Sequence, residues 1–324
     1  MAQLDVGHAF QRSDIHCCER LNRSEIIVSH DGVTGFSVPD MTPHQSHGEQ
    51  LLKINGVELC VETFGDRTDP AIILVAGSAA SMLWWDAELC ERIAVRGRFV
   101  VRYDHRDTGR SACCPPGRPA YSFTDLTLDV LGIQDALGIE RAHVVCQSMF
   151  GGSGLILGVD HPDRVASLTF VSSSTGADDL PPPSSDLAMP AEPDSSDAAE
   201  AVEYVVAGAR AYAGGSPYFD EAAIRALAEH DVARAKSYAS TLVNHYAIEF
   251  DGPVRGGFGD IAAPTLVVHG DHDPFLPLPH GEALRDAIPG AELLVLKGAG
   301  HDLPRPVWDD FVSALVRHTE VGRP

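Results

Sequence analysis

Ser148 stands where a short apolar run gives way to a glycine-rich segment, in H-V-V-C-Q-S-M-F-G-G-S-G, which starts at His143. This order of residues predicts a strand, a sharp turn and a helix, an arrangement that holds a serine hydroxyl exposed on a strained turn as a nucleophile. The usual pattern is G-x-S-x-G, and here Cys146 and Phe150 replace the two glycines. The stretch therefore supplies a candidate nucleophile in an altered context.

A serine hydroxyl is a weak nucleophile at neutral pH and needs an oriented base within about 2.6–3.2 Å. His301, in G-A-G-H, and Asp273, in G-D-H-D-P, follow the serine in the order Ser, Asp, His. We predict that His301 accepts the serine proton and that Asp273 holds the imidazole in the required tautomer. Asp271 competes for the role of the acid, but the spacing of Asp273 from Gly270 and Pro277 favours an inward orientation.

Acyl transfer also requires donors for the negative oxygen that develops on the substrate. We expect two backbone N–H groups to serve, one from Met149, directly after the serine, and one from Ser78, in the loop after the apolar run 71–75. One such donor lowers the barrier by roughly 3–4 kcal/mol. The sequence therefore predicts an oxyanion hole formed by Ser78 and Met149.

Aromatic side chains are the candidates for contact with a substrate. The residues to which we assign this role are Trp84, Phe150, Tyr212 and Tyr246. The pair Trp84–Trp85 fits a place in the core better than substrate stacking, although we keep Trp84 as a candidate for contact with a substrate. Six aromatic residues between 204 and 246 divide between packing and the inner wall of a cavity: Tyr204, Tyr212, Tyr218, Phe219, Tyr238 and Tyr246.

Phe150 occupies a position where glycine is usual, because helix and sheet come close there. A phenyl ring at this point must be redirected, and overpacking costs about 1–3 kcal/mol. The ring can project into the pocket and reshape it, or it can displace Ser148. Gly151 and Gly152 follow directly and can absorb the distortion.

The charged segment D-H-R-D-T-G-R-S at 104–111 has the residue types of a functional site. We favour a structural role, in which ion pairs and Gly109 brace a sharp turn after the strand predicted at 99–103.

Strands that alternate with helices must position these groups. The apolar runs predict strands at 51–54, 59–64, 71–75, 99–103, 142–145, 165–171, 265–269 and 292–296. Helical patterns continue from Gly77 to about Ala94 and cover 125–137, 151–159, 198–212, 221–230, 231–246, 281–288 and 308–318. This alternation predicts an α/β fold with a mostly parallel central sheet and helices on both faces. Ligands of such sheets bind beyond the carboxyl ends of the strands, where Ser148, Asp273 and His301 all fall.

The pattern divides the chain into three parts. Residues 1–46 show no clear period and are interpreted as a poorly ordered extension. Residues 47–175 and 255–320 carry the α/β core. Residues 176–254 interrupt the alternation with prolines, acidic residues and helical patterns, which predicts a helical cap.

The charge and the cysteine content of the chain limit the kinds of partner and the compartment that we expect. The chain has 24 basic and 46 acidic residues and a formal net charge of −22. We expect neither nucleic acid nor membrane as a partner, because such a chain repels anionic surfaces. Seven cysteines without a C-x-x-C pair argue against a zinc ribbon or a disulfide framework and favour reduced thiols in the cytoplasm. The oligomeric state stays open.

Together these segments resemble the α/β-hydrolase family over residues 50–320. The matching pieces are the turn at 77–78, D-H-R-D-T-G-R-S, the 146–150 segment, G-D-H-D-P and G-A-G-H. Within that family the chain is most similar to the methylesterases of anthracycline biosynthesis, of the aclacinomycin type. The similar parts are R-Y-D-H-R-D-T-G-R-S at 102–111, R-A-H-V-V at 141–145, S-M at 148–149, H-D-P at 272–274 and P-H-G at 279–281.

The resemblance implies that Ser148, Asp273 and His301 are catalytic and that no cofactor or metal takes part. It implies as substrate a large aromatic polyketide with a carbomethoxy group, bound between core and cap. Our first interpretation is therefore a serine-dependent carboxylic ester hydrolase with an acyl-enzyme. The altered turn keeps two alternatives open: a cyclisation, decarboxylation or rearrangement on the same scaffold, with His301 as a general base, or a ligand-binding protein without catalysis.

Overall fold

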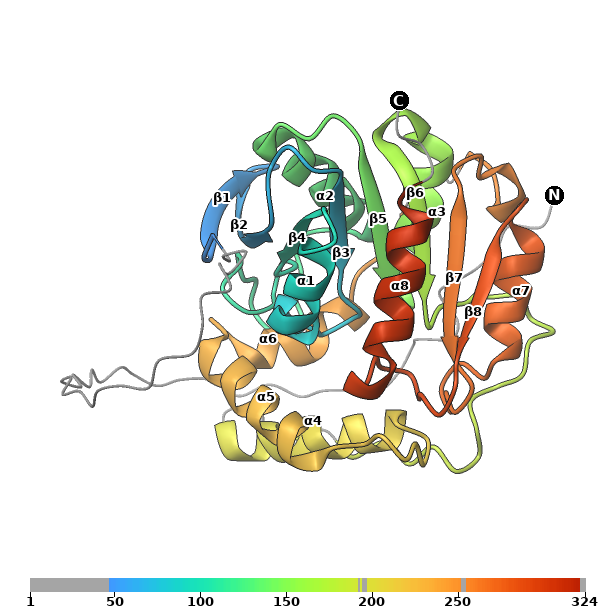
Figure 1. Cartoon of the computed structure of the whole chain (residues 1–324). Helices are drawn as coiled ribbons and strands as arrows, with labels where there is room; N and C mark the ends of the chain where they lie inside the picture. Colours follow the sequence, from blue (N-terminus) through green and yellow to red (C-terminus); the bar gives the residue numbers. More distant parts are fainter. Residues whose placement is uncertain (1–46, 192, 194–196, 252–254, 321–324) are drawn as a thin grey trace, which may run out of the picture.

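The computed structural model describes residues 47–191, 193, 197–251 and 255–320, so the predicted extension at 1–46 lies outside the described residues. The described residues form an eight-stranded sheet in the order β1-β2-β4-β3-β5-β6-β7-β8 (Figure 1). Its strands are β1 (Gln50–Ile54), β2 (Val57–Phe64), β3 (Ala71–Val75), β4 (Phe99–Tyr103), β5 (Ala142–Gln147), β6 (Val165–Val171), β7 (Thr265–Gly270) and β8 (Glu292–Leu296). The pairs β1–β2 and β2–β4 are antiparallel, and every pair from β4 to β8 is parallel. The predicted fold class is confirmed.

The antiparallel edge begins with a tight hairpin. Ile54 pairs with Val57, which leaves Asn55 and Gly56 as a two-residue loop. Their φ angles are 47° and 83°, as a type I′ turn requires at both positions. The Asn-Gly pair therefore sets the register of the first two strands.

Helices cover both faces of the sheet (Figure 1). On one face lie α1 (Ala87–Ala94) and α8 (Trp308–His318), which contact each other and bury Leu89 and Phe311 in a common cluster. The opposite cluster includes Phe123, Leu157 and Leu284, from α2 (Phe123–Leu137), α3 (Gly151–Asp160) and α7 (Pro279–Ala287). None of the helices in the described part of the chain is long and apolar enough to cross a membrane.

The helix predicted from Gly77 to Ala94 is wrong in its first half. The structure has a short 3₁₀ helix, η2 (Met82–Trp84), and α1 begins only after Asp86. The Asp86 side chain accepts a hydrogen bond from the N–H of Glu88, which makes it the N-cap of α1. The break separates the neighbouring tryptophans: Trp85 is buried in the core, whereas Trp84 lines a cavity.

Three helices occupy the segment between β6 and β7: α4 (Ala198–Tyr212), α5 (Glu221–Arg234) and α6 (Tyr238–Val243). They lie beyond the carboxyl ends of the parallel strands (Figure 1), and we call them the cap helices. We predicted a break between residues 230 and 231, but α5 continues to Arg234. Asp231 is buried inside the helix, where it accepts a hydrogen bond from Trp84 Nε1, and Ser237 caps the following helix.

The 104–111 loop joins the core to the cap helices, in line with the structural role that we favoured. Asp104 is fully buried and lies 2.8 Å from the guanidinium of Arg234 on α5. Asp107 accepts a hydrogen bond from Asn244, which follows α6, at 2.8 Å. His245 accepts a hydrogen bond from the N–H of Ala79 at 3.1 Å and lies 2.9 Å from the Arg106 carbonyl oxygen. The cap is therefore bonded to two loops at the edge of the sheet.

Candidate active site

Ser148 lies at the turn between β5 and α3, in the short 3₁₀ helix η3 (Ser148–Phe150). Its φ of 54° places it in the left-handed region, which a residue other than glycine occupies only where its surroundings enforce it. The Ser173 hydroxyl donates to the Ser148 carbonyl oxygen at 2.8 Å and helps to fix the turn. Gly151 allows this contact, because a Cβ at this position would lie 2.0 Å from Ser173 Oγ.

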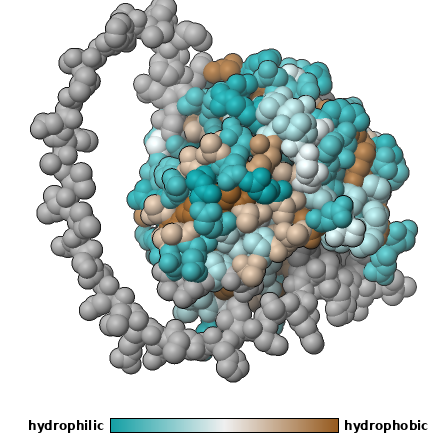
Figure 2. Space-filling model, turned by 90° about the horizontal axis from the view of Figure 1, so that it is seen from below, coloured by the Kyte–Doolittle hydropathy of each residue, from teal (hydrophilic) through white to brown (hydrophobic). Residues whose placement is uncertain are grey.

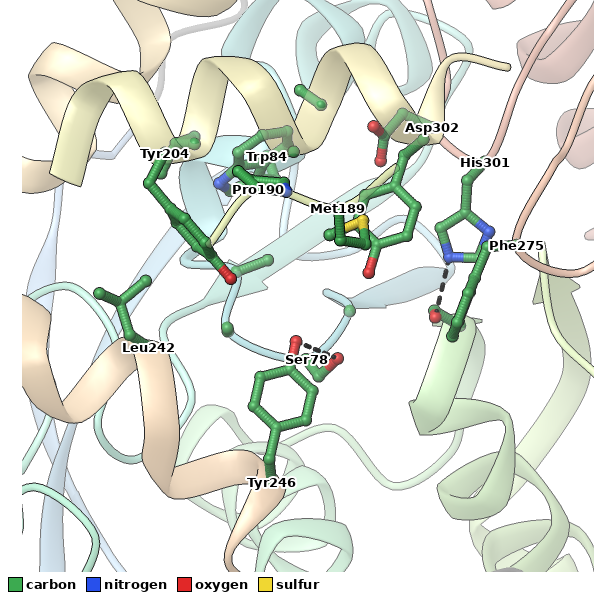
Figure 3. A pocket seen from close by; sticks show the side chains of 18 of the residues that line it. Ser78, Trp84, Met189, Pro190, Tyr204, Leu242, Tyr246, Phe275, His301 and Asp302 are labelled. Atoms are coloured by element: carbon green, nitrogen blue, oxygen red, sulfur yellow. Dashed lines mark hydrogen bonds between the residues drawn. The ribbon is translucent and has the colours of Figure 1, made fainter. Parts of the chain in front are cut away.

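The structure brings Ser148, His301 and Asp273 together in the expected order. His301 Nε2 lies 2.9 Å from Ser148 Oγ, and His301 Nδ1 lies 2.7 Å from Asp273 Oδ2. Figure 3 shows the first of these contacts as a dashed line at one side of the cavity. The other oxygen of Asp273, Oδ1, accepts hydrogen bonds from the N–H groups of Phe275 and Leu276, both at 2.9 Å. This geometry allows the imidazole to accept the serine proton.

Asp271, the competing acid, lies outside this constellation. Its carboxylate accepts a hydrogen bond from the N–H of Gly298 at 2.7 Å and lies 3.3 Å from Lys297 Nζ. These contacts brace the loop that precedes His301.

Burial and neighbouring charges shift the pKa values of Asp273 and His301 in opposite directions. We call Ser148, His301 and Asp273 the relay residues. Burial disfavours the carboxylate of Asp273, but the charge of His301 and the hydrogen bonds from His269 and His301 hold its pKa below the ordinary range. Burial likewise disfavours the imidazolium of His301, yet Asp273 raises the pKa of His301 above its ordinary value of 6.5. Asp273 is therefore ionised at neutral pH and stabilises a proton on His301.

The pH dependence of activity follows from this shift. His301 can act as a base only when it is neutral, so kcat/KM falls when the imidazole takes up a proton. Since the pKa of His301 is raised, the acid limb of kcat/KM is expected above pH 6.5, with activity lost as the pH falls through that limb. Measurement with a neutral aryl ester from about pH 5 to 9 tests this. An acid limb at or below pH 6.5 would contradict it.

The loop after β3 approaches the serine from the other side. A Cβ at Gly77 would lie 3.6 Å from Ser148 Cβ, so glycine brings the backbone close to Ser148. Ser78 lines the same cavity as Ser148, and its hydroxyl donates to Tyr246 Oη at 3.4 Å. Met149, directly after the serine, packs its side chain against the core. The assignment of the Ser78 and Met149 N–H groups to an oxyanion hole stays a prediction.

A cavity of about 550 Å³ opens above Ser148 between the sheet and the cap helices. The aromatic residues among those that line it are Trp84, Tyr204, Tyr212, Tyr238, Tyr246 and Phe275. Figure 3 shows His301 and Phe275 at one side of this space and Tyr204 and Leu242 at the other. Seen from the cap side, hydrophobic side chains gather near the middle of a largely hydrophilic face (Figure 2).

Trp84, Tyr212 and Tyr246 thus lie where a substrate-binding role requires them. Tyr212 also lies close to His301, since the centroids of the two rings are 5.3 Å apart. The prediction from sequence missed Phe275 and Asp302, which line the cavity from the loops that carry Asp273 and His301. The signal that could have revealed them is their position, since Phe275 is two residues after Asp273 and Asp302 is one residue after His301.

Phe150 does not line the cavity, so its assignment as a substrate-binding residue is wrong. Its ring is fully buried and stacks on the ring of His105, with centroids 4.0 Å apart and planes at 14°. The ring of Phe123 lies on another side, at 5.7 Å. Burial lowers the pKa of His105 to about 3, assisted by the nearby His245, so a neutral imidazole faces the phenyl ring. The ring of Phe150 is redirected into the core, and Ser148 keeps its place beside His301.

Replacing Phe150 by alanine is expected to lower the free energy of unfolding by about 3–5 kcal/mol, because it leaves a cavity between His105 and Phe123. Chemical denaturation of the variant and the parent measures the change. Phe250→Ala is a matched control, since this ring also stacks on Phe123 but is 37% exposed. Equal losses in the two variants would show that Phe150 is not a core residue.

In the part of the chain that the structure describes, no group of three or more His, Cys, Asp or Glu residues is arranged so that it could hold a metal ion.

A mostly parallel sheet that holds a serine on a strained turn beneath helices is typical of the α/β hydrolases. Comparison with known proteins gives the same class. The family model described as "alpha/beta hydrolase fold" matches residues 70–304, and the chain belongs to this family. Rhodomycin D methylesterase DauP of Streptomyces sp. (strain C5) is 31% identical to it over 84% of this chain and 98% of the relative. Rhodomycin D methylesterase DnrP of Streptomyces peucetius has the same identity and the same two coverages. The expected resemblance to anthracycline methylesterases is confirmed, and it supports ester hydrolysis as the reaction class.

Solved structures support the fold. The enol-lactonase from Burkholderia xenovorans LB400 aligns with a TM-score of 0.62 and 24% identity, over 84% of this chain and all of that one. The meta-cleavage product hydrolase CumD from Pseudomonas fluorescens IP01 aligns with a TM-score of 0.66 and 19% identity, over 84% and 97%.

Proposed function

We propose that this chain is a serine-dependent methylesterase that hydrolyses the carboxylic methyl ester of a bulky, aromatic, polyketide-like substrate through an acyl-enzyme. The observation that carries the proposal is the bonded series Ser148, His301 and Asp273 beneath a cavity with aromatic walls. The two methylesterase relatives, aligned over nearly their full length, support the class of substrate.

The first half of the reaction uses the contacts at Ser148. His301 Nε2 accepts the hydroxyl proton while Oγ attacks the ester carbonyl carbon, and Asp273 stabilises the resulting imidazolium. The negative oxygen faces the backbone N–H groups of Ser78 and Met149 in this proposal, as well as the N-terminal end of the helix after Ser148. Collapse of the tetrahedral intermediate expels methanol, which takes the proton from His301, and leaves the acyl group on Ser148.

The second half repeats these steps with water. His301 removes a proton from water, the hydroxide attacks the acyl carbon, and Ser148 leaves with the proton that His301 returns. The net change is one ester and one water converted into a carboxylic acid and methanol. The cap helices supply the wall that holds the aromatic part of the substrate, through Tyr204, Tyr212 and Tyr238.

The altered turn was the reason to consider non-hydrolytic chemistry or simple ligand binding. The altered turn gives these alternatives less support, because the Phe150 ring lies in the core and not in the cavity over Ser148. The departure at Cys146 is accommodated as well: its side chain is fully buried in the core cluster, and Gly154 opposite its sulfur atom has no side chain, where a Cβ would lie only 3.4 Å away. No observation in the described structure favours either alternative over ester hydrolysis.

Two measurements test the proposal. The protein is incubated with methyl anthraquinone-2-carboxylate and methanol release is followed, and separately with a fluorophosphonate for intact mass. Methanol release together with one adduct per chain supports the proposal. The absence of an adduct, with turnover that survives in Ser148→Ala but not in His301→Ala, would identify a general-base reaction without a covalent intermediate.

A further inference from the structure

The cavity over Ser148 has an unusual balance of charge. Among the described residues that line it, none is lysine or arginine, and Asp302 is the only carboxylate. The sequence between residues 178 and 203, which includes the lining residues Met189 to Ala191, likewise contains acids but no lysine or arginine. A charged group inside this cavity therefore meets a negative side chain and no permanent cation among the described residues.

Asp302, which is partly exposed to the cavity, differs from the buried acids of the fold. Asp104 is paired with Arg234 and Asp129 with Arg106, whereas Asp302 has neither a hydrogen bond nor an ion pair with any described residue. Burial raises the pKa of Asp302, although the nearby His301 opposes the shift. Figure 3 shows its carboxylate at the edge of the cavity, on the side that faces Trp84 and Met189. The side chain is thus available to whatever enters the cavity.

The proposed reaction changes the charge of the molecule held in the cavity that Asp302 lines. Hydrolysis converts a neutral ester into a carboxylate and a proton. An anion held in this cavity is repelled by the Asp302 carboxylate unless a proton is taken up on the anion, on Asp302 or on His301, and this uptake costs free energy at any pH above the pKa of the group that takes the proton. A neutral ester incurs neither cost. A cation gains from the carboxylate and from the faces of the tyrosine and tryptophan rings.

We propose that Asp302 makes this cavity select its ligands by charge, so that neutral and cationic aromatic esters are bound and anions, including the acid product, are expelled. The part that concerns the product rests on the proposed esterase function; the selection itself concerns binding alone. Asp302 would be a specificity-determining residue that also favours product release.

Binding to the inactive Ser148→Ala protein tests the inference without any turnover. The probes are methyl anthraquinone-2-carboxylate, anthraquinone-2-carboxylate and 2-(aminomethyl)anthraquinone, measured by calorimetry at neutral pH. We expect the ester to bind at least about tenfold more tightly than the acid, and the amine to bind no less tightly than the ester. Adding Asp302→Asn should reduce the preference for ester over acid by about fivefold or more.

Two further variants in the same Ser148→Ala protein serve as controls. Asp302→Glu keeps the charge in the cavity, and Asp286→Asn removes one charge at the surface, where Asp286 pairs with Arg285. Both should keep the preference for the ester. An unchanged preference in Asp302→Asn, an equal shift in Asp286→Asn, or failure of the ester to bind would overturn the inference. Failure of the esterase proposal would instead be detected as the absence of methanol release by the unsubstituted protein.

Discussion

Replacing Ser148 by alanine is expected to lower kcat/KM for a methyl ester by about 10⁴–10⁶-fold, because the variant lacks the oxygen that forms the acyl-enzyme. His301 and Asp273 stay bonded to each other, so the loss reflects the nucleophile and not a collapsed site. Steady-state methanol release measures the effect, and the fluorophosphonate adduct should disappear in the same variant.

Ser173→Ala is the matched control for this prediction. Its hydroxyl bonds the carbonyl oxygen of Ser148 and is not part of the relay, so activity should fall far less than in Ser148→Ala. If Ser148→Ala kept turnover within tenfold of the parent, the covalent mechanism would be excluded.

Asp273→Asn is expected to reduce kcat by about 10⁴-fold with little change in folding. The two N–H groups of Phe275 and Leu276 bond one oxygen of Asp273 and should select the orientation in which the amide oxygen takes that place. The amide NH₂ then faces His301 Nδ1, which must become an acceptor. The proton moves to Nε2, and the imidazole can no longer accept a proton from Ser148.

Asp271→Asn separates this explanation from a general loss of negative charge. Asp271 lies only two residues away, and its contacts are with Gly298 and Lys297. We expect its substitution to change kcat by less than about tenfold, since no tautomer depends on it. Comparable losses in the two variants would mean that the choice of Asp273 over Asp271 is wrong.

The positions of the three relay residues could be predicted because each follows an apolar run that suits a buried parallel strand. The carboxyl ends of such strands meet at one edge of the sheet, so Ser148, Asp273 and His301 had to be near each other. The distances of 2.9 and 2.7 Å could not be predicted, because they depend on the loops that precede Asp273 and His301. These loops are held by contacts from other segments, such as the hydrogen bond from the His301 N–H to the carbonyl oxygen of Tyr212.

The direction of Phe150 could not be predicted for a similar reason. The motif shows that a ring occupies a crowded position, but its place depends on His105 and Phe123, which come from distant segments. The break before α1 was missed because Asp86 reads as a polar helix residue until its capping bond is seen. Asp302 was missed because an acid in a loop suggests a side chain at the outer surface, and only the folded structure shows that it lines the cavity.

The contacts of His245 limit how the domain above the active site can be exchanged during evolution. The imidazole of this residue, which follows α6, accepts a hydrogen bond from the N–H of Ala79, directly after Ser78 in the loop predicted to stabilise the anion, and also contacts the Arg106 carbonyl oxygen. A chimaera that takes residues 176–254 from a relative would bring new specificity but would also remove a support of that loop. Transplants should therefore retain catalysis only when the donor segment carries a histidine at this position or is exchanged together with the loop that it contacts.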